Sequence, residues 1–302
     1  MKSLGYLISR NTRLFFKDRG TLLAAMIAPL ILLCLFVTFL GNVYRDSLLS
    51  NLPQGITLGE TLLEGFVGGW LISSLLAVSG VTVAFTANMT MVQDRINGAR
   101  HDLLISPVKP SVLQLSYYFS TVLITLIICT LCLGVGLIYL YFTGWYLTAA
   151  SIGLVFLDLL LVVLFGTALS SIICSFLTSQ GGVSAVTSVV SSVYGFLCGA
   201  YMPISQFSKP LRNVIGCLPG TYGTSLLRNH MTADVLKAML SAQLPADVTE
   251  GIKDVFDINL YFMDHSVGLG RMYLVMTVTI VVLVLAYIAL NLIKGKARQN
   301  LN

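Results

Sequence analysis

Residues 22–40 read LLAAMIAPLILLCLFVTFL, a continuous run that contains no charged side chain. A helix rises about 1.5 Å per residue, so a run of this length crosses most of a hydrocarbon core about 30 Å thick. Lipid offers no hydrogen-bond partner to backbone N–H and C=O groups, and only structures that pair these groups internally can span it. The run therefore predicts a membrane-spanning helix.

Five similar runs follow along the chain. Together with the first, they predict spans at residues 22–41, 66–87, 117–142, 152–177, 183–202 and 272–293. Strands that cross a membrane would instead give alternating segments of about ten residues. We therefore expect an all-α polytopic membrane protein with six transmembrane helices, which form one transmembrane domain over residues 1–302.

The scarcity of charge supports this class. Of 302 residues, 18 are Lys or Arg and 13 are Asp or Glu, so 10% of the chain is charged and 56% is hydrophobic. A typical soluble domain is about 25% charged. Because so few charges cannot cover a water-facing surface, the composition excludes a soluble enzyme, a disordered tail and a disulfide scaffold.

The basic residues predict the orientation. They gather in the N-terminal segment, the 88–113 connection and the C-terminal tail, as Lys2, Arg10, Arg13, Lys17, Arg19, Arg95, Arg100, Lys109, Lys294, Lys296 and Arg298. A six-span topology puts these segments on one side, which the positive-inside rule makes cytoplasmic. We expect an inner or plasma membrane protein with both termini in the cytoplasm and no cleavable signal peptide.

Residues 1–21, before the first span, predict a basic amphipathic helix. Apolar residues recur at near-helical spacing on one face, at Leu4, Leu7, Ile8, Leu14 and Phe15, and this apolar repeat is interrupted at Asn11. Basic residues recur on another face, at Arg10, Arg13 and Lys17. Such a helix lies in the headgroup plane, attracted by anionic lipid. A compatible interpretation is a positive flank that only orients the first span.

The 88–113 connection joins the second and third spans on the same predicted side. Its charges begin at Asp94, and Pro107 should end a short helix that presents Leu103 and Leu104. Apolar side chains ringed by charge suit docking into the groove of a partner protein. The pattern alone favours an ordinary solvated loop.

The 203–271 segment is the largest stretch outside the spans. Pro203, Pro210 and Pro219 bracket two segments that are too short to cross a membrane. We expect a re-entrant or interfacial hairpin here, because irregular backbone at membrane depth must be covered by protein or water. The more polar residues 232–271 should form a water-exposed cap with helices at about 233–244 and 246–256.

At these two connections the sequence resembles the membrane subunit of a type-2 ABC exporter. The coupling pattern of that family is matched by Asp94, Arg95, Gly98, Leu103, Leu104, Ser106, Pro107 and Val108. Ala99 stands where Thr is usual, and Asp94 where Glu is common. The pattern after the fifth span is matched by Gly199, Pro203, Leu211, Pro219, Tyr222 and Arg228. The resemblance covers nearly the whole chain, although residues 232–271 are not part of the minimal pattern.

The resemblance implies an elbow helix, re-entrant helices between spans five and six, and a dimer of permease subunits with two cytoplasmic ABC ATPase subunits. It implies ATPase coupling through Asp94, Arg95, Gly98, Arg100, Leu103, Leu104 and Pro107. It implies an outer gate at Pro203, Leu211, Pro219, Tyr222 and Arg228. The chain has no G-x-x-x-x-G-K-S/T loop, so we expect ATP and Mg²⁺ to be bound by the partner, and no enzymatic activity here.

Polar residues within the spans are few. Asp158 is the one charge, and it is either a polar point on an export route or, as the pattern favours, a hydrogen-bonding group that ties helices together. The fifth span carries small residues along one face, at Ser184, Ser188, Ser192, Gly195 and Gly199. They indicate either an export path with a dimer interface or packing within the subunit. Gly65, Gly68 and Gly69 predict close helix packing in the second span.

The histidines and cysteines predict no metal site. His101, His230 and His265 are expected in solvated loops, and the Cys129–Cys132 pair lies in a lipid-length run without a neighbouring ligand. Apolar packing is the favoured interpretation of that pair.

We predict a permease subunit that exports a hydrophobic or amphipathic compound such as a drug, an antimicrobial peptide or a lipid. Two alternatives stay open: a polysaccharide or lipid-linked glycan exporter, and a membrane sensor or immunity component that does not transport. Nothing in the sequence predicts nucleic-acid binding.

Overall fold

The structure is a computed structural model that describes residues 2–53, 58–242, 244–263 and 265–299. Side chains are not described for Lys2 or for residues 294–299, so the basic tail of Lys294, Lys296 and Arg298 lies outside the described side chains. The elements, in chain order, are α1 (Lys2–Lys17), α2 (Arg19–Leu35), η1 (Phe36–Leu40), α3 (Gly41–Ser50), α4 (Glu60–Ala87), α5 (Met89–Ile96), α6 (Ala99–Ile105), α7 (Pro110–Thr143), α8 (Ala149–Cys174), α9 (Gln180–Leu197), η2 (Ile204–Gln206), α10 (Lys209–Gly216), α11 (Pro219–Ser241), α12 (Ala246–Val255), β1 (Leu260–Phe262), β2 (His265–Val267) and α13 (Leu269–Gln299).

Within the described residues, five helical segments are long and apolar enough to cross a membrane: Arg19–Ser50, Glu60–Ile96, Pro110–Thr143, Ala149–Cys174 and Leu269–Ile293. This confirms the all-α polytopic class. The predicted fifth span, 183–202, corresponds to α9, which is 18 residues long and therefore rises about 27 Å. Serine and threonine dilute its apolar character, and the count of six spans stays a prediction.

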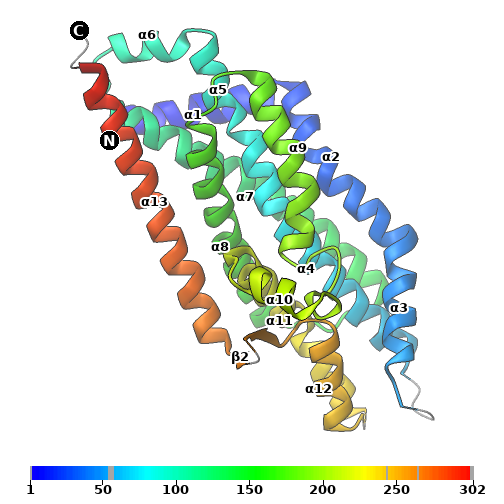
Figure 1. Cartoon of the computed structure of the whole chain (residues 1–302). Helices are drawn as coiled ribbons and strands as arrows, with labels where there is room; N and C mark the ends of the chain where they lie inside the picture. Colours follow the sequence, from blue (N-terminus) through cyan, green and yellow to red (C-terminus); the bar gives the residue numbers. More distant parts are fainter. Residues whose placement is uncertain (1, 54–57, 243, 264, 300–302) are drawn as a thin grey trace.

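Helix α4 forms the centre of the bundle, with α2, α7, α8 and α11 packed around it (Figure 1). The most apolar window of its segment is completely buried, as expected for a helix enclosed by other helices. The predicted glycine packing is confirmed. A Cβ atom at Gly65 would lie 2.9 Å from the Gly144 carbonyl oxygen, and one at Gly69 would lie 3.0 Å from the Met231 carbonyl oxygen.

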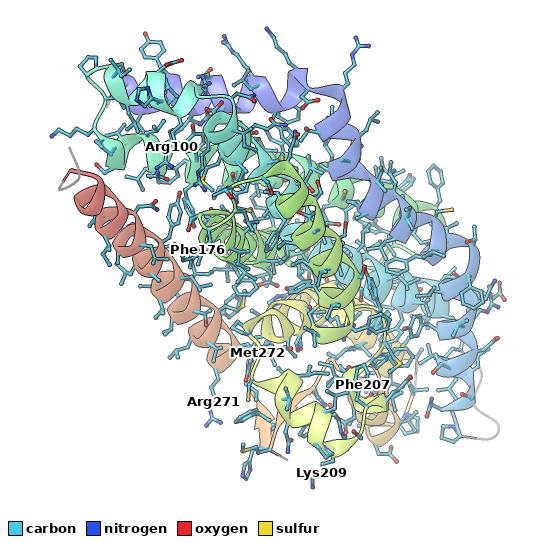
Figure 2. All side chains as sticks on the ribbon, turned by 45° about the horizontal axis from the view of Figure 1, so that its top comes forward. Arg100, Phe176, Phe207, Lys209, Arg271 and Met272 are labelled. Carbon is cyan, nitrogen blue, oxygen red and sulfur yellow. The ribbon has the colours of Figure 1, made fainter. Side chains whose placement is uncertain are left out.

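The two ends of the molecule carry different elements. Figure 1 shows both chain termini at the end that carries α5 and α6, with α1 lying across this end, while α10, α12 and β2 lie at the opposite end. In Figure 2, Arg100 lies at the α6 end and Lys209 and Arg271 lie toward the α12 end. Both termini thus share one end, and its cytoplasmic location stays a prediction.

The prediction of a separate cap helix at about 233–244 is wrong. Helix α11 runs without a break from Pro219 to Ser241, so the second half of the expected hairpin and the first cap helix are one element. No glycine or proline interrupts residues 224–241, and buried side chains such as Met231 and Val235 continue along the helix. The expected second cap helix is present as α12, followed by an antiparallel β1–β2 hairpin that the sequence analysis missed.

The predicted amphipathic helix is present as the continuous helix α1, and Asn11 is the polar residue that interrupts its apolar face. The Asn11 side chain is buried, and its amide donates to the Ser116 hydroxyl on α7 over 3.4 Å. Leu7 and Phe15 are buried as well. The elbow therefore packs on protein along one face as well as presenting basic residues.

Candidate transport groove and partner-facing segment

A groove of about 1130 Å³ lies between the first long helical segment and α9. Its first wall consists of residues from α2, η1 and α3: Ala24, Ile27, Ala28, Ile31, Leu32, Leu35, Phe36, Phe39, Leu40, Val43, Tyr44 and Ser47. Its second wall is formed by Ser184, Thr187, Ser188, Ser191, Ser192 and Phe196 of α9, and Thr86, Met89, Tyr201, Met202 and Gln206 complete the lining. None of these described lining residues carries a charge. The predicted export-path serines thus face one cavity.

The two walls differ in chemistry. The first wall is apolar, and side chains such as Ile27, Ile31 and Phe39 are more than half exposed. On the second wall, the Ser188 hydroxyl donates to the Ser184 carbonyl oxygen over 2.9 Å, and the Ser192 hydroxyl donates to the Ser188 carbonyl oxygen over 2.8 Å. The remaining lone pairs of these hydroxyls are free to accept hydrogen bonds.

Two local features shape this groove. The first wall contains the π-helical turn η1, a kind of turn that is frequent at functional sites. At the α12 end, the Tyr44 hydroxyl donates to the Tyr201 carbonyl oxygen over 2.8 Å and so joins the first wall to the segment after α9. The sequence shows no signal for the π-turn, because its hydrogen-bond register depends on the surrounding packing.

The glycines predicted to continue the serine face do not do so. A Cβ at Gly195 would run into the ring of Tyr201, and one at Gly199 would lie 2.6 Å from the Ile204 side chain. Helix α9 ends at Leu197, and Gly199 has a φ of 72°, so the two glycines do not form a continuous helical ridge. They serve a tight chain reversal within the subunit, which favours the intrasubunit packing alternative for these two glycines. Their part in a dimer interface stays a prediction.

Helices α5 and α6 form the predicted coupling segment. Gly98 joins them with a φ of 79°, a left-handed conformation that glycine adopts without strain. On α6, Leu103 and Leu104 are half-buried against the core, whereas Ile105 is 73% exposed. Pro107 is also exposed. The predicted docking residues are the two leucines, but the most exposed apolar side chain of this helix is the isoleucine beside them.

Asp94 is buried and engaged within the subunit. Its carboxylate accepts two hydrogen bonds from the Arg10 guanidinium, at 2.7 and 3.1 Å, and one from the Tyr117 hydroxyl at 2.7 Å. The hydrogen bond that the Arg10 guanidinium donates to Asp94 raises the pKa of Arg10 above its usual value. Asp94 therefore ties the elbow α1 and the start of α7 to α5, and any part it has in coupling is through these helices.

Arg95 also makes contacts within the subunit. Its guanidinium donates to the carbonyl oxygens of Leu177 at 2.6 Å and Ser175 at 3.2 Å, which follow the last turn of α8. A cation at a helix C-terminus is favoured by the helix dipole as well as by these hydrogen bonds. Arg95 and Arg100 are both half-buried, and the described contacts of the Arg95 guanidinium tie α5 to the end of α8.

The residues of the predicted outer gate do not form one exposed rim. Leu211 is exposed on α10, whereas Pro203 and Tyr222 are buried, and the Tyr222 hydroxyl donates to the Gly216 carbonyl oxygen over 2.8 Å. Pro219 begins α11, and Arg228 is completely enclosed. Most of these side chains hold the connection between α9 and α11 together, and their role in gating stays a prediction.

Asp158 lies away from the groove and joins three helices. It is fully buried on α8, accepts from the Tyr273 hydroxyl of α13 at 2.6 Å, and lies 2.5 Å from Nδ1 of His230. His230 is on α11 and not in a solvated loop, which corrects the prediction made for it. The arrangement supports the structural interpretation of Asp158, because its oxygen atoms are engaged by α11 and α13.

We expect Asp94→Ala to loosen the elbow and to lower the free energy of unfolding by about 2 kcal/mol. Hydrogen bonds to a charged group are worth about 1.5–3 kcal/mol, and the substitution leaves Arg10 and Tyr117 without their acceptor. Hydrogen exchange in α1, measured in lipid nanodiscs, should rise. Arg13→Ala is the control, since Arg13 is exposed on the same helix. Equal exchange in the two variants would contradict the assignment.

These elements define a class of protein: a polytopic helical bundle with an amphipathic helix across one end, a short helical segment beside it and a groove along its side. The family model described as ABC-2 type transporter matches residues 2–232, well over half of the chain. The chain belongs to the ABC-2 type transporter family. It is therefore a permease component of an ABC transporter and works in a membrane with an ABC ATPase. No match is found among curated proteins.

Proposed function

We propose that the chain is the membrane subunit of an ATP-driven exporter that moves a hydrophobic or amphipathic compound out of the cell. The groove is the observation that carries this proposal. Its first wall extends from Ala24 to Ser47, so at about 1.5 Å per residue it follows most of a membrane-spanning helix. A groove that is long, apolar on one side and free of charged lining residues suits a compound that leaves by way of the lipid phase.

The ATP-hydrolysing step belongs to a separate polypeptide. Two cytoplasmic ABC ATPase subunits, which bind ATP and Mg²⁺, would dock at the α6 end, with Ile105 as the central apolar contact. The side chain of Ile105 is 73% exposed, on a helix without a buried residue. An exposed apolar side chain rimmed by polar ones is the usual composition of a docking contact.

Movement of α6 would reach the groove through the contacts behind it. Arg10 and Tyr117 link α5 to α1 and α7, and Arg95 links it to the end of α8. Helix α1 leads directly into α2, the first wall of the groove. The chain would thus act as a two-state element whose balance depends on the nucleotide state of the ATPase.

A second copy of the chain would complete the transporter as a homodimer. Helix α9 buries only Val183 and Gly195, and its Val189 and Val193 are exposed beside the serines without lining the groove. Apolar side chains adjoining a cavity at the side of a subunit suit contact with another subunit. The proposed location is the cell membrane, with both termini in the cytoplasm.

The proposal is tested by co-purification and transport. The chain and its ABC ATPase would be reconstituted in proteoliposomes, and export of fluorescent amphiphiles would be followed with ATP or with a non-hydrolysable analogue. ATP-dependent movement supports an exporter. Ligand binding without movement under any nucleotide condition would contradict it and would favour a sensor.

The glycan alternative has one observation in its favour. Phe39 is 62% exposed and Phe196 is 49% exposed on opposite walls of the groove, and exposed aromatic faces can stack on sugar rings. ATP-dependent uptake of a lipid-linked oligosaccharide into inverted vesicles, without movement of simple amphiphiles, would favour this second function.

We expect Ile105→Asp to weaken the association with the ABC ATPase by about 10–100-fold. Burying an isoleucine side chain is worth about 1.5–3 kcal/mol, and the substitution also places a charge in an apolar contact. Affinity would be measured by microscale thermophoresis in detergent. Ile96→Asp is the matched control, because Ile96 is exposed on neighbouring α5. If both variants bind as tightly as the unchanged chain, docking at α6 is excluded.

A further inference from the structure

The groove has a chemical preference that can be inferred from its walls. Its lining includes no lysine, arginine, histidine, aspartate or glutamate among the described residues. Transfer of a full charge into such surroundings costs several kcal/mol unless an opposite charge meets it. The groove therefore discriminates against amphiphiles that carry a carboxylate, phosphate or ammonium group at this depth.

The first wall favours a long apolar chain. This wall follows the helix from Ala24 to Ser47. The volume of the groove, about 1130 Å³, exceeds the range of about 300–1,000 Å³ that is typical of sites for drug-sized ligands. The half-exposed side chains of Ile27, Ile31 and Phe39 offer a continuous apolar surface along this length. An elongated ligand would bury more of this surface than a compact one.

The second wall favours hydrogen-bond donors. The hydroxyl protons of Ser188 and Ser192 are committed to carbonyl oxygens of their own helix, so these groups meet a ligand as acceptors. Thr187 lines the same wall, and its hydroxyl has no hydrogen-bond partner among the described residues, so this group can accept as well as donate. A ligand with N–H or O–H groups along one side would satisfy acceptors that an apolar ligand would leave unused.

We propose that the groove binds an elongated, uncharged amphiphile whose amide or hydroxyl groups donate to the α9 wall while its hydrocarbon chain lies on the α2–α3 wall. The inference rests on the proposed export function and names the class of compound exported. The ligand class is that of N-acylated or hydroxylated single-chain lipids, in contrast to fatty acids and alkylammonium compounds of equal length.

The test uses three probes that share one alkyl chain and differ in the head: an N-acyl ethanolamine, a fatty carboxylate and an alkyltrimethylammonium. Each competes, at matched concentration in the bilayer, with a diazirine-bearing N-acyl ethanolamine for photo-crosslinking to the chain in phosphatidylcholine nanodiscs. We expect adducts on α2 and α9 peptides and at least a tenfold stronger competition by the uncharged probe. Equal competition by all three, or adducts confined to other helices, would overturn the inference.

Variants of the second wall sharpen the result. Ser188→Ala combined with Ser192→Ala should weaken competition by the uncharged probe by about 30-fold, because each lost hydrogen bond is worth about fivefold in affinity. Ser188→Asp should shift the preference toward the alkylammonium probe, whereas Thr178→Asp, at an exposed position before α9, should leave it unchanged. An unaltered preference in Ser188→Asp would contradict the assignment of this wall.

Transport separates the two proposals. Selective binding of the uncharged probe without ATP-driven movement contradicts the exporter function and leaves the ligand class standing. ATP-driven export of all three probes at equal rates contradicts the ligand class and leaves the exporter function standing.

Discussion

Arg228→Ala should lower the free energy of unfolding by about 3–5 kcal/mol, more than any other single loss of a polar contact in this chain. This is the range found when one partner of a buried ion pair is removed. Arg228 is 1% exposed and lies 3.7 Å from the Asp257 carboxylate. Its guanidinium donates to the Gly199 carbonyl oxygen and, over 3.2 Å, to the Ser74 hydroxyl. It also lies 4.3 Å from the ring centre of Trp70.

The effect is large because Arg228 joins segments that are distant in sequence. Burial raises the pKa of the Asp257 carboxyl, while the Arg228 charge and the N–H groups of Ile204 and Ser205 act to lower it. Without the arginine, this carboxyl group would stay buried with no cation near it. The substitution also empties the space above Trp70, so packing is lost as well as charge.

Unfolding in mixed micelles, followed by tryptophan fluorescence, measures this loss. Arg212→Ala is the control, because Arg212 is exposed on α10 and should change stability by less than about 0.5 kcal/mol. Arg228→Met combined with Asp257→Asn should recover part of the stability, since no uncompensated charge remains. The assignment fails if Arg228→Ala costs no more than the control.

Apolar periodicity predicted the helices well, because hydrophobic length is a local property. The expected runs at 66–87 and 117–142 lie inside α4 and α7, which extend beyond them with more polar residues at their ends. The short helices α1, α6 and α12 were also indicated by local patterns: an amphipathic stretch, a proline that ends a helix, and a polar helical run.

Partners of charged residues could not be predicted in the same way. Asp94 and Arg10 are 84 positions apart, and His230 lies 72 positions from Asp158. Such pairs depend on how helices pack and rotate against one another, which no short pattern encodes. For this reason the sequence indicates Asp94 as part of a coupling pattern and His230 as a loop residue, without indicating the side chains that they contact.

The length of α11 has a clear signal in the sequence. The prolines before it indicate short broken segments, yet no glycine or proline occurs from Thr224 to Ser241. The buried residues Leu227, Met231 and Val235 continue at intervals of four, which is the spacing of a single helix face. These two local features together indicate one continuous helix through residues 224–241.

Gly166→Leu should cost about 3 kcal/mol by forcing α8 away from α4. A Cβ at Gly166 would run into the Gly80 carbonyl oxygen and would lie 2.9 Å from the Cα atom of Val81. Both neighbours are backbone atoms of a helix enclosed on all sides, so neither can move aside as a flexible side chain would. Overpacking usually costs about 1–3 kcal/mol, and rigid neighbours place this position at the upper end.

Gly153→Leu provides a matched control on the same helix, because a Cβ at Gly153 meets nothing within 4 Å. Both substitutions raise helix propensity by the same amount, so the difference between them isolates packing against α4. Gly153→Leu should be neutral or slightly stabilising in the same micelle titration. If the two variants unfold alike, α4 and α8 are not held at backbone contact. If they differ as expected, α8 packs on α4 at backbone contact beside Gly166.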